Sequence, residues 1–140
     1  EKINSLKTNE LSYQKNLKKL NKQYISLYAK NIKSFSSDDT DIFISDCSDL
    51  NHDQIRHLID EIKSTHHNSI SIFYLSNSNK LNCYIGISKQ CTHKYSAKKL
   101  LDILNKKYKL KGGGSDTFTT LIIDVQDKST FHRTLKQIFK

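Results

Sequence analysis

The residues best suited to chemistry in this sequence lie between positions 89 and 114. Eight lysines and a single acid, Asp102, occupy positions 89 to 111, and three of the chain's four glycines follow directly at Gly112, Gly113 and Gly114. A lysine ammonium group is a point charge that attracts phosphate, and the N–H groups of a bare backbone can meet phosphate oxygens. The segment therefore predicts an anion-binding surface. The eight lysines are Lys89, Lys94, Lys98, Lys99, Lys106, Lys107, Lys109 and Lys111.

The glycine triplet follows a lysine-rich helical pattern and precedes a predicted strand, which favours an irregular connection. Glycine can leave a helix in the left-handed region without a Cβ clash, and three in a row would also let a ligand backbone approach closely. A flexible linker is the alternative interpretation. No Gly-Lys-Ser/Thr sequence follows, so the triplet is not a P-loop.

Composition agrees with an anionic partner. The 140 residues carry a net charge of +9 and a pI near 9.4, which favours nucleic acid or an anionic surface. A lysine-rich composition inherited from an AT-rich genome, with the lysines simply solvated, is the competing explanation. No stretch approaches the roughly 18 apolar residues of a membrane span, so no membrane partner is expected. The odd number of cysteines, three, favours a reducing, cytoplasmic location.

A heptad pattern over residues 3–28 predicts a long amphipathic helix, of coiled-coil type or packed on another surface. An ordinary core helix is the alternative. Only Glu10 interrupts the a and d positions, and the polar segment 34–41 after the helix reads as a loop or hinge. We therefore expect a helical stalk at 1–35 and a globular domain at 36–140. The apolar heptad positions are Ile3, Leu6, Tyr13, Leu17, Leu20, Tyr24 and Leu27.

The remaining patterns predict an α/β domain. Strands are expected at 41–45, 69–77, 81–89 and 118–125, and helices at 51–64, 96–108 and 129–139. Asn51 with Gln54 three residues later predicts a capping box at the first of these helices. The order indicates a mixed β-sheet covered by helices and preceded by the long helix.

Other combinations of reactive residues give weak signals. His66 and His67 are adjacent and point in divergent directions, and Cys91 with His93 lacks the paired spacing of a zinc site. The same Cys–His pair has no supporting context as a nucleophile. Cys47 and Cys83 fall in or beside predicted strands and are expected in the core. The acids Asp38, Asp39 and Asp41 are expected in an exposed loop.

The hairpin at 70–92 followed by "YSAKKLLDILNKKYKLKGGGSDTFTT" resembles the carboxy-terminal domain of alanyl-tRNA synthetase, which is related to the DHH-associated domain of certain phosphoesterases. Ala97, Lys111, the three glycines and Asp116 hold the matching places. Nuclease relatives carry a histidine directly after the glycines, where this chain has Ser115. The Arg-Pro that usually follows the triplet in the synthetases is also absent.

The resemblance implies a tRNA-binding module without catalytic residues, part of an alanine–tRNA ligase whose aminoacylation and editing domains lie upstream in the chain. It implies alanine-specific tRNA as partner, held near its outer corner, and a possible homodimer. It implies no cofactor in this fragment, with zinc, ATP and magnesium belonging to the parent enzyme. The expected tRNA-binding residues are Lys98, Lys99, Lys106, Lys107, Lys109, Lys111, Gly112, Gly113 and Gly114.

Two other functions stay open from the sequence. The chain could be the associated domain of a trans-editing hydrolase or a DHH-type phosphoesterase, for which zinc-ligand histidines in a preceding sequence would be the sign. It could also be a structural module in which the heptad helix mediates dimerisation.

Overall fold

The computed structural model describes residues 2–77, 79–92, 94–124 and 127–139. Within these ranges it describes the side chains from residue 9 onward, except that of Asn77. The heptad positions Ile3 and Leu6 therefore lie outside the described side chains, and His93 lies outside the described residues.

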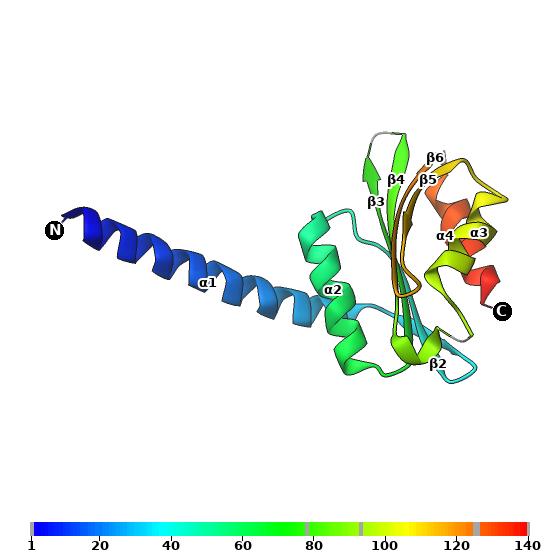
Figure 1. Ribbon diagram of the computed structural model, residues 1–140, viewed down its shortest axis with the longest axis horizontal. Coiled ribbons are helices and arrows are strands. Elements are labelled where there is room, and N and C mark those ends of the chain that lie inside the picture. Colours follow the sequence, from blue (N-terminus) through cyan, green and yellow to red (C-terminus); the bar gives the residue numbers. More distant parts are fainter. Residues whose placement is uncertain (1, 78, 93, 125–126, 140) are drawn as a thin grey trace.

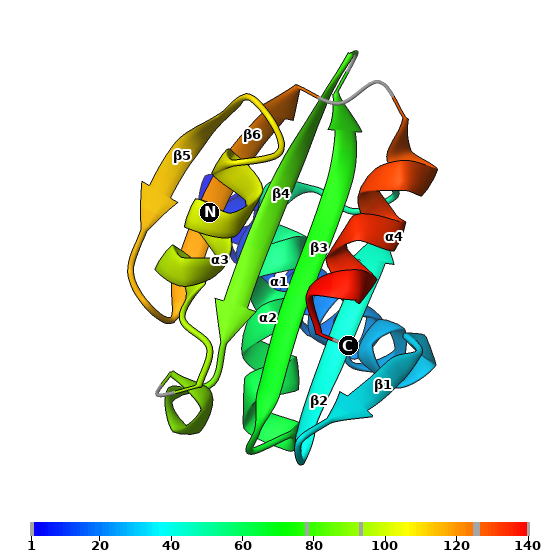
Figure 2. The same cartoon turned by 90° about the vertical axis from the view of Figure 1, so that its right-hand side faces the viewer.

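A six-stranded mixed sheet forms the centre of the molecule, in the order β1-β2-β3-β4-β6-β5 (Figure 2). β2 and β3 are parallel, and every other neighbouring pair is antiparallel. The parallel pair requires a crossover, which α2 supplies. The strands are β1 (Ser34–Ser37), β2 (Thr40–Asp46), β3 (Ser69–Asn77), β4 (Lys80–Ile87), β5 (Leu110–Gly114) and β6 (Phe118–Asp124).

Helices cover both faces of the sheet, which confirms the predicted fold class. α2 (His52–Thr65) lies on one face, and α3 (Ala97–Asn105) and α4 (Lys128–Ile138) lie on the other (Figure 1). α1 (Lys2–Asn31) precedes the sheet and projects away from it, and a short 3-10 helix, η1 (Lys89–Cys91), follows β4. None of the described helices is long and apolar enough to span a membrane.

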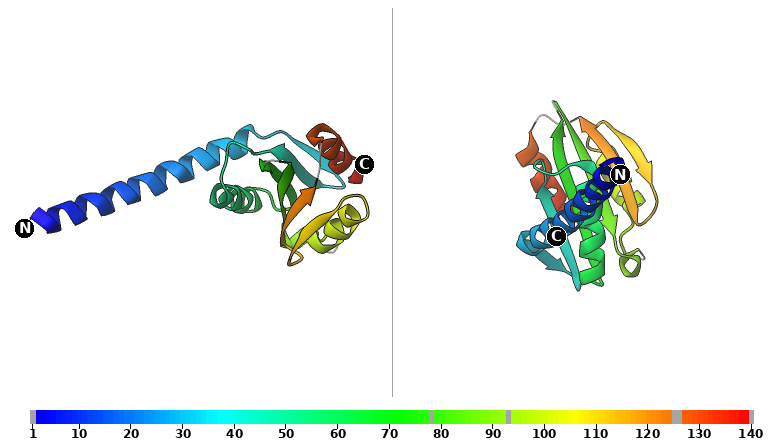
Figure 3. Two further views of the ribbon diagram at one scale, coloured as in Figure 1. Left: turned by 90° about the horizontal axis from the view of Figure 1, so that it is seen from above. Right: turned by 90° about the vertical axis from the view of Figure 1, so that its left-hand side faces the viewer.

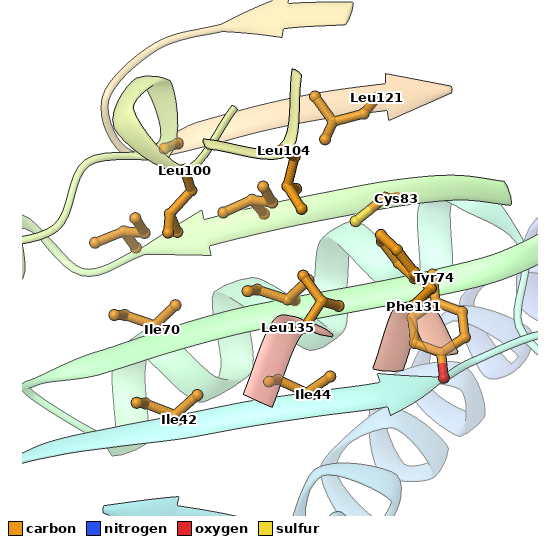
Figure 4. Close-up of a cluster of buried hydrophobic side chains, with 14 of the residues drawn as sticks. Ile42, Ile44, Ile70, Tyr74, Cys83, Leu100, Leu104, Leu121, Phe131 and Leu135 are labelled. Atoms are coloured by element: carbon orange, nitrogen blue, oxygen red, sulfur yellow. The ribbon is translucent and has the colours of Figure 1, made fainter. Parts of the chain in front are cut away.

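The larger core lies between the sheet and the helices α3 and α4 (Figure 4). Alternate residues of β2, β3, β4 and β6 point into it and meet Leu104 of α3 and Leu135 of α4. Phe131 of α4 is fully buried and packs edge-on against Tyr74, with ring centroids 5.5 Å apart. The Tyr74 hydroxyl lies 2.8 Å from His132 Nδ1. Burial raises the pKa of Tyr74 to about 12, so the phenol stays protonated at neutral pH.

A second core lies under α2, on the opposite face. Ile55, Leu58, Ile59 and Ile62 follow the helical period and are all buried. Ile59 packs directly over Gly86 of β4, where an added Cβ would overlap the Ile59 side chain. The predicted capping box is confirmed at the start of α2, because Asn51 accepts from the Gln54 N–H and Gln54 accepts in return.

The end of α1 is attached to the domain through α2. Ile25 is buried in the α2-side core, Ser26 donates to Glu61 over 3.2 Å, and the Tyr28 hydroxyl donates to Asp49 over 3.0 Å. The preceding turns extend beyond the globular part (Figures 1 and 3). A division of the chain into 1–35 and 36–140 stays a prediction.

The sequence predicted a loop or hinge at 34–41, but part of this segment forms a strand. Residues 34–37 form β1, which pairs with the start of β2, and Asp38 and Asp39 make the tight turn between them. Both aspartates have positive φ, 50° and 63°. Aspartate tolerates this region better than most residues, so the acidic pair serves the turn.

The three cysteines are buried and unpaired by disulfides, and the expectation of core positions for Cys47 and Cys83 is confirmed. Burial raises the pKa of Cys47 to about 11 and that of Cys83 to about 12. At neutral pH both thiols are protonated, which makes them poor nucleophiles.

Candidate nucleic-acid interface

The lysine-rich segment begins in η1, continues through α3 and ends in β5. The Ser96 side chain starts α3 by accepting from the Lys99 N–H over 3.1 Å, and the helix ends at Asn105. The chain then turns through Tyr108 and enters β5 at Leu110.

Tyr108 fixes this turn to the core. Its ring packs edge-on against Phe131, with centroids 5.6 Å apart, and its hydroxyl donates to Thr134 Oγ1 over 3.2 Å. Leu110 also packs against the α3–α4 core, whereas Lys107 and Lys109, on either side of Tyr108, are exposed. One inward aromatic side chain thus holds a basic segment whose charges face solvent.

Five lysines surround one hollow of about 840 Å³, which we call the lysine hollow. Lys106, Lys107, Lys109 and Lys111 come from the predicted site, and Lys80 comes from β4. Sequence reasoning missed Lys80 because it lies in a hairpin far from the cluster along the chain. β4–β6 pairing places it opposite Asp124, and the Asp124 N–H in turn bonds the Lys109 carbonyl.

Two predicted lysines lie elsewhere. Lys98 and Lys99 are exposed in the first turn of α3, at the opposite end of that helix from Lys106, and they do not line the lysine hollow. Any common ligand would therefore have to extend along α3. Their assignment to the site stays a prediction.

The lysine hollow has a strong uncompensated charge. Within the described part of the chain, the two ion pairs are His66 with Asp41 and Lys128 with Asp46, and none of these residues lines the hollow. Asp124 is the one acid that lines it. Exposed lysines that have no carboxylate partner favour an anionic ligand.

The glycine triplet does not form the predicted connection at a helix end. Gly112, Gly113 and Gly114 form most of β5 and pair with residues 119–121 of β6. No glycine in the described residues has a positive φ, so left-handed backbone is not the reason for them. The reason for two of them is a close approach of strands, because a Cβ at Gly112 would overlap the Thr120 carbonyl oxygen and one at Gly114 would overlap that of Phe118.

Gly113 has no such constraint. A Cβ built there meets nothing within 4 Å. The fold therefore needs glycine at two positions of the triplet and leaves the middle one without a structural explanation.

Ser115 closes the β5–β6 hairpin at the position where nuclease relatives are expected to carry histidine. Its N–H donates to the Phe118 carbonyl over 2.8 Å, and its hydroxyl accepts from the Phe118 N–H over 3.2 Å. A serine engaged in this turn offers no proton-transfer group near neutral pH.

Metal binding has no support in the described residues. They contain no group of three or more His, Cys, Asp or Glu side chains that could hold an ion. His66 instead pairs with Asp41 at 3.0 Å and packs edge-on against Phe43.

The family model described as the DHHA1 domain matches residues 39–140. The chain belongs to the DHHA1 domain family. This DHHA1 domain is similar in fold to the C-Ala domain of the alanyl-tRNA synthetase of Aquifex aeolicus, with a TM-score of 0.66 and 22% identity over 77% of this chain and 98% of that one. It is also similar to a DHH domain protein described as a member of the s1p family of ribosomal proteins, with a TM-score of 0.65 and 14% identity.

The second similarity covers 87% of this chain but only 31% of the length of the DHH protein. No curated protein matches the sequence significantly. The resemblance predicted from the hairpin, the lysines and the glycines is confirmed at the level of family and fold.

Proposed function

We propose that this chain is a tRNA-binding domain of an alanine–tRNA ligase. It holds alanine-specific tRNA through phosphate contacts, and the domains that precede it in such ligases carry out aminoacylation and editing. ATP, magnesium and zinc belong to those domains in this proposal. Recognition by backbone charge and shape is the usual mode for structured RNA.

The lysine hollow is the observation that carries this proposal. Five exposed lysines from β4, the turn after α3 and β5 converge there, without ion-pair partners among the described residues. Family membership and a fold shared with a synthetase C-Ala domain support the choice of tRNA among anionic ligands. Ser115 holds the hairpin position at which the nuclease relatives are expected to carry histidine, and this favours binding over phosphoester hydrolysis.

Replacing Lys106, Lys107, Lys109 and Lys111 with alanine should weaken tRNA binding and flatten its dependence on salt. For every phosphate that the variant no longer neutralises, the slope of log affinity against log salt should fall by about one. Fluorescence anisotropy with labelled tRNA at several salt concentrations measures both quantities.

A matched control replaces four lysines of α1, Lys15, Lys18, Lys19 and Lys22, which changes the net charge equally. This variant should keep most of the affinity and slope. Equal reductions in the two variants would show that net charge alone binds RNA, and an affinity of the native chain that is indifferent to salt would contradict the proposal.

A second function, self-association through α1, is favoured by its exposed apolar stripe. Tyr13, Leu17, Leu20, Tyr24 and Leu27 are each 46–70% exposed at heptad spacing. The e and g positions beside this stripe are neutral Gln14, Asn16, Asn21 and Gln23, while lysines occupy the outer positions. Like-charge repulsion across a seam is therefore absent over this stretch.

The double change Leu17→Asp with Leu20→Asp should abolish any dimer yet leave the monomer's free energy of unfolding within about 0.5 kcal/mol, because both side chains are exposed. Sedimentation equilibrium measures the first effect and chemical denaturation the second. As a contrast, Ile25→Asp, on the side buried against α2, should destabilise the domain by at least about 2 kcal/mol. Unchanged sedimentation of the double variant would mean that the stripe does not associate.

A further inference from the structure

The sheet face opposite α3 is open over β5 and the part of β6 that follows Phe118. α2 contacts β3 and β4 on that face, and in the right view of Figure 3 β5 and β6 lie to the side of α2. Along β6, Leu121 and Ile123 are buried under α3, whereas Ile122 between them is 49% exposed on the open face. One exposed apolar side chain is ordinary by itself, so a binding surface is inferred here from the groups that surround Ile122.

A hollow of about 770 Å³ occupies this open face, and we call it the α2-side hollow. His52 and Arg56 of α2 form its side, and Asn82, Thr120 and Ile122 of the sheet lie along it. Lys111 and Ile122 line both this hollow and the lysine hollow, so the two are adjacent.

The chemistry of the α2-side hollow suits a flat heterocycle. The Arg56 guanidinium lies 5.2 Å above the centre of the Phe118 ring and forms a planar, cationic stacking surface, while Ile122 offers an apolar one. Asn82 and Thr120 also line the hollow, and their amide and hydroxyl groups can both donate and accept hydrogen bonds to a ligand. Stacking surfaces beside a basic track are the usual elements of binding to unpaired nucleotides.

Gly113 is the strand partner of a residue that lines this hollow. It pairs with Thr120, which lines the hollow, and β6 pairing places Tyr84 on the other side of Thr120. Paired residues of adjacent strands share a face, so a side chain at 113 would project over the open face. Because glycine has no side chain, nothing projects from position 113 between the lysine hollow and the α2-side hollow.

We propose that the α2-side hollow binds one unpaired nucleobase of the RNA whose phosphates contact the lysine hollow. This inference rests on the RNA binding proposed above and adds a base site to it. The base lies against Ile122 and the Arg56–Phe118 pair, with its polar edge toward Asn82 and Thr120, and its backbone passes over Gly113.

The test compares a blunt RNA duplex with the same duplex carrying unpaired nucleotides in one strand. The native chain should bind the second RNA more tightly by about 5- to 150-fold, the range expected for stacking one base. Ile122→Ser and Gly113→Val should each remove most of this preference, measured as the ratio of the affinities for the two RNAs. A fluorescent aminopurine among the unpaired bases reports stacking directly, and its emission should be quenched by the native chain and not by these variants.

Ile103→Ser is the matched control, since Ile103 is 37% exposed on α3, on the covered side of the sheet. It should keep the full preference. Circular dichroism confirms that each variant is folded. Ile122→Ser removes side-chain volume and Gly113→Val adds it, so the same loss of preference in both would point to the base site and not to a folding defect.

Equal binding of the two RNAs by the native chain, or a preference that survives both variants, overturns the base site. If binding in that case still depends on the lysines of the lysine hollow, the proposed function stands alone. Binding of neither RNA nor tRNA overturns both proposals.

Discussion

Replacing Phe131 with alanine is expected to lower the free energy of unfolding by about 3–5 kcal/mol, the range for removing a buried aromatic side chain. Phe131 is fully buried between α4 and the sheet and packs edge-on against both Tyr74 and Tyr108. Its removal would leave a cavity lined by two aromatic rings. Urea denaturation followed by circular dichroism measures the change.

The same change should disturb the lysine hollow, because Tyr108 holds the turn between Lys107 and Lys109 by packing on Phe131. Phe131→Leu retains most of the side-chain volume and should lose less stability and less tRNA affinity. A decrease below about 1 kcal/mol for alanine would mean that α4 is not packed on the sheet as described.

Gly112→Ala should destabilise the domain by about 1–3 kcal/mol, whereas Gly113→Ala should leave it unchanged or slightly more stable. A Cβ at Gly112 would overlap the Thr120 carbonyl oxygen and lie 2.8 Å from the Leu121 Cα, so β5 would have to move away from β6. A Cβ at Gly113 meets open space. Alanine also restricts the unfolded chain more than glycine does, which favours the folded state where no clash occurs.

Thermal and urea denaturation of the two alanine variants make a direct comparison of neighbouring residues with the same chemical change. Gly114→Ala should behave like Gly112→Ala, because its Cβ would overlap the Phe118 carbonyl oxygen. Equal stability of the Gly112 and Gly113 variants would contradict the pairing of β5 with β6.

The sequence by itself determined the helices, the long strands and the identity of the basic segment. The apolar residues of α2 and α3 repeat at helical spacing, and the Asn51–Gln54 capping box is a short-range signal that does not depend on the rest of the fold. Resemblance in the lysine and glycine run was also sufficient to indicate the family. These features are local, so a linear pattern contains them.

Only the tertiary structure decided what the glycines do and which residues meet around them. Glycine is disfavoured in strands. β5 forms because it pairs with β6, which lies between β4 and β5 in the sheet. The same strand order brings Lys80 to the lysine hollow and Arg56 over Phe118, contacts between segments far apart along the chain. β1 likewise depends on pairing with β2. A pattern of neighbouring residues cannot contain such contacts, because they arise only when the sheet order and register place distant strands side by side.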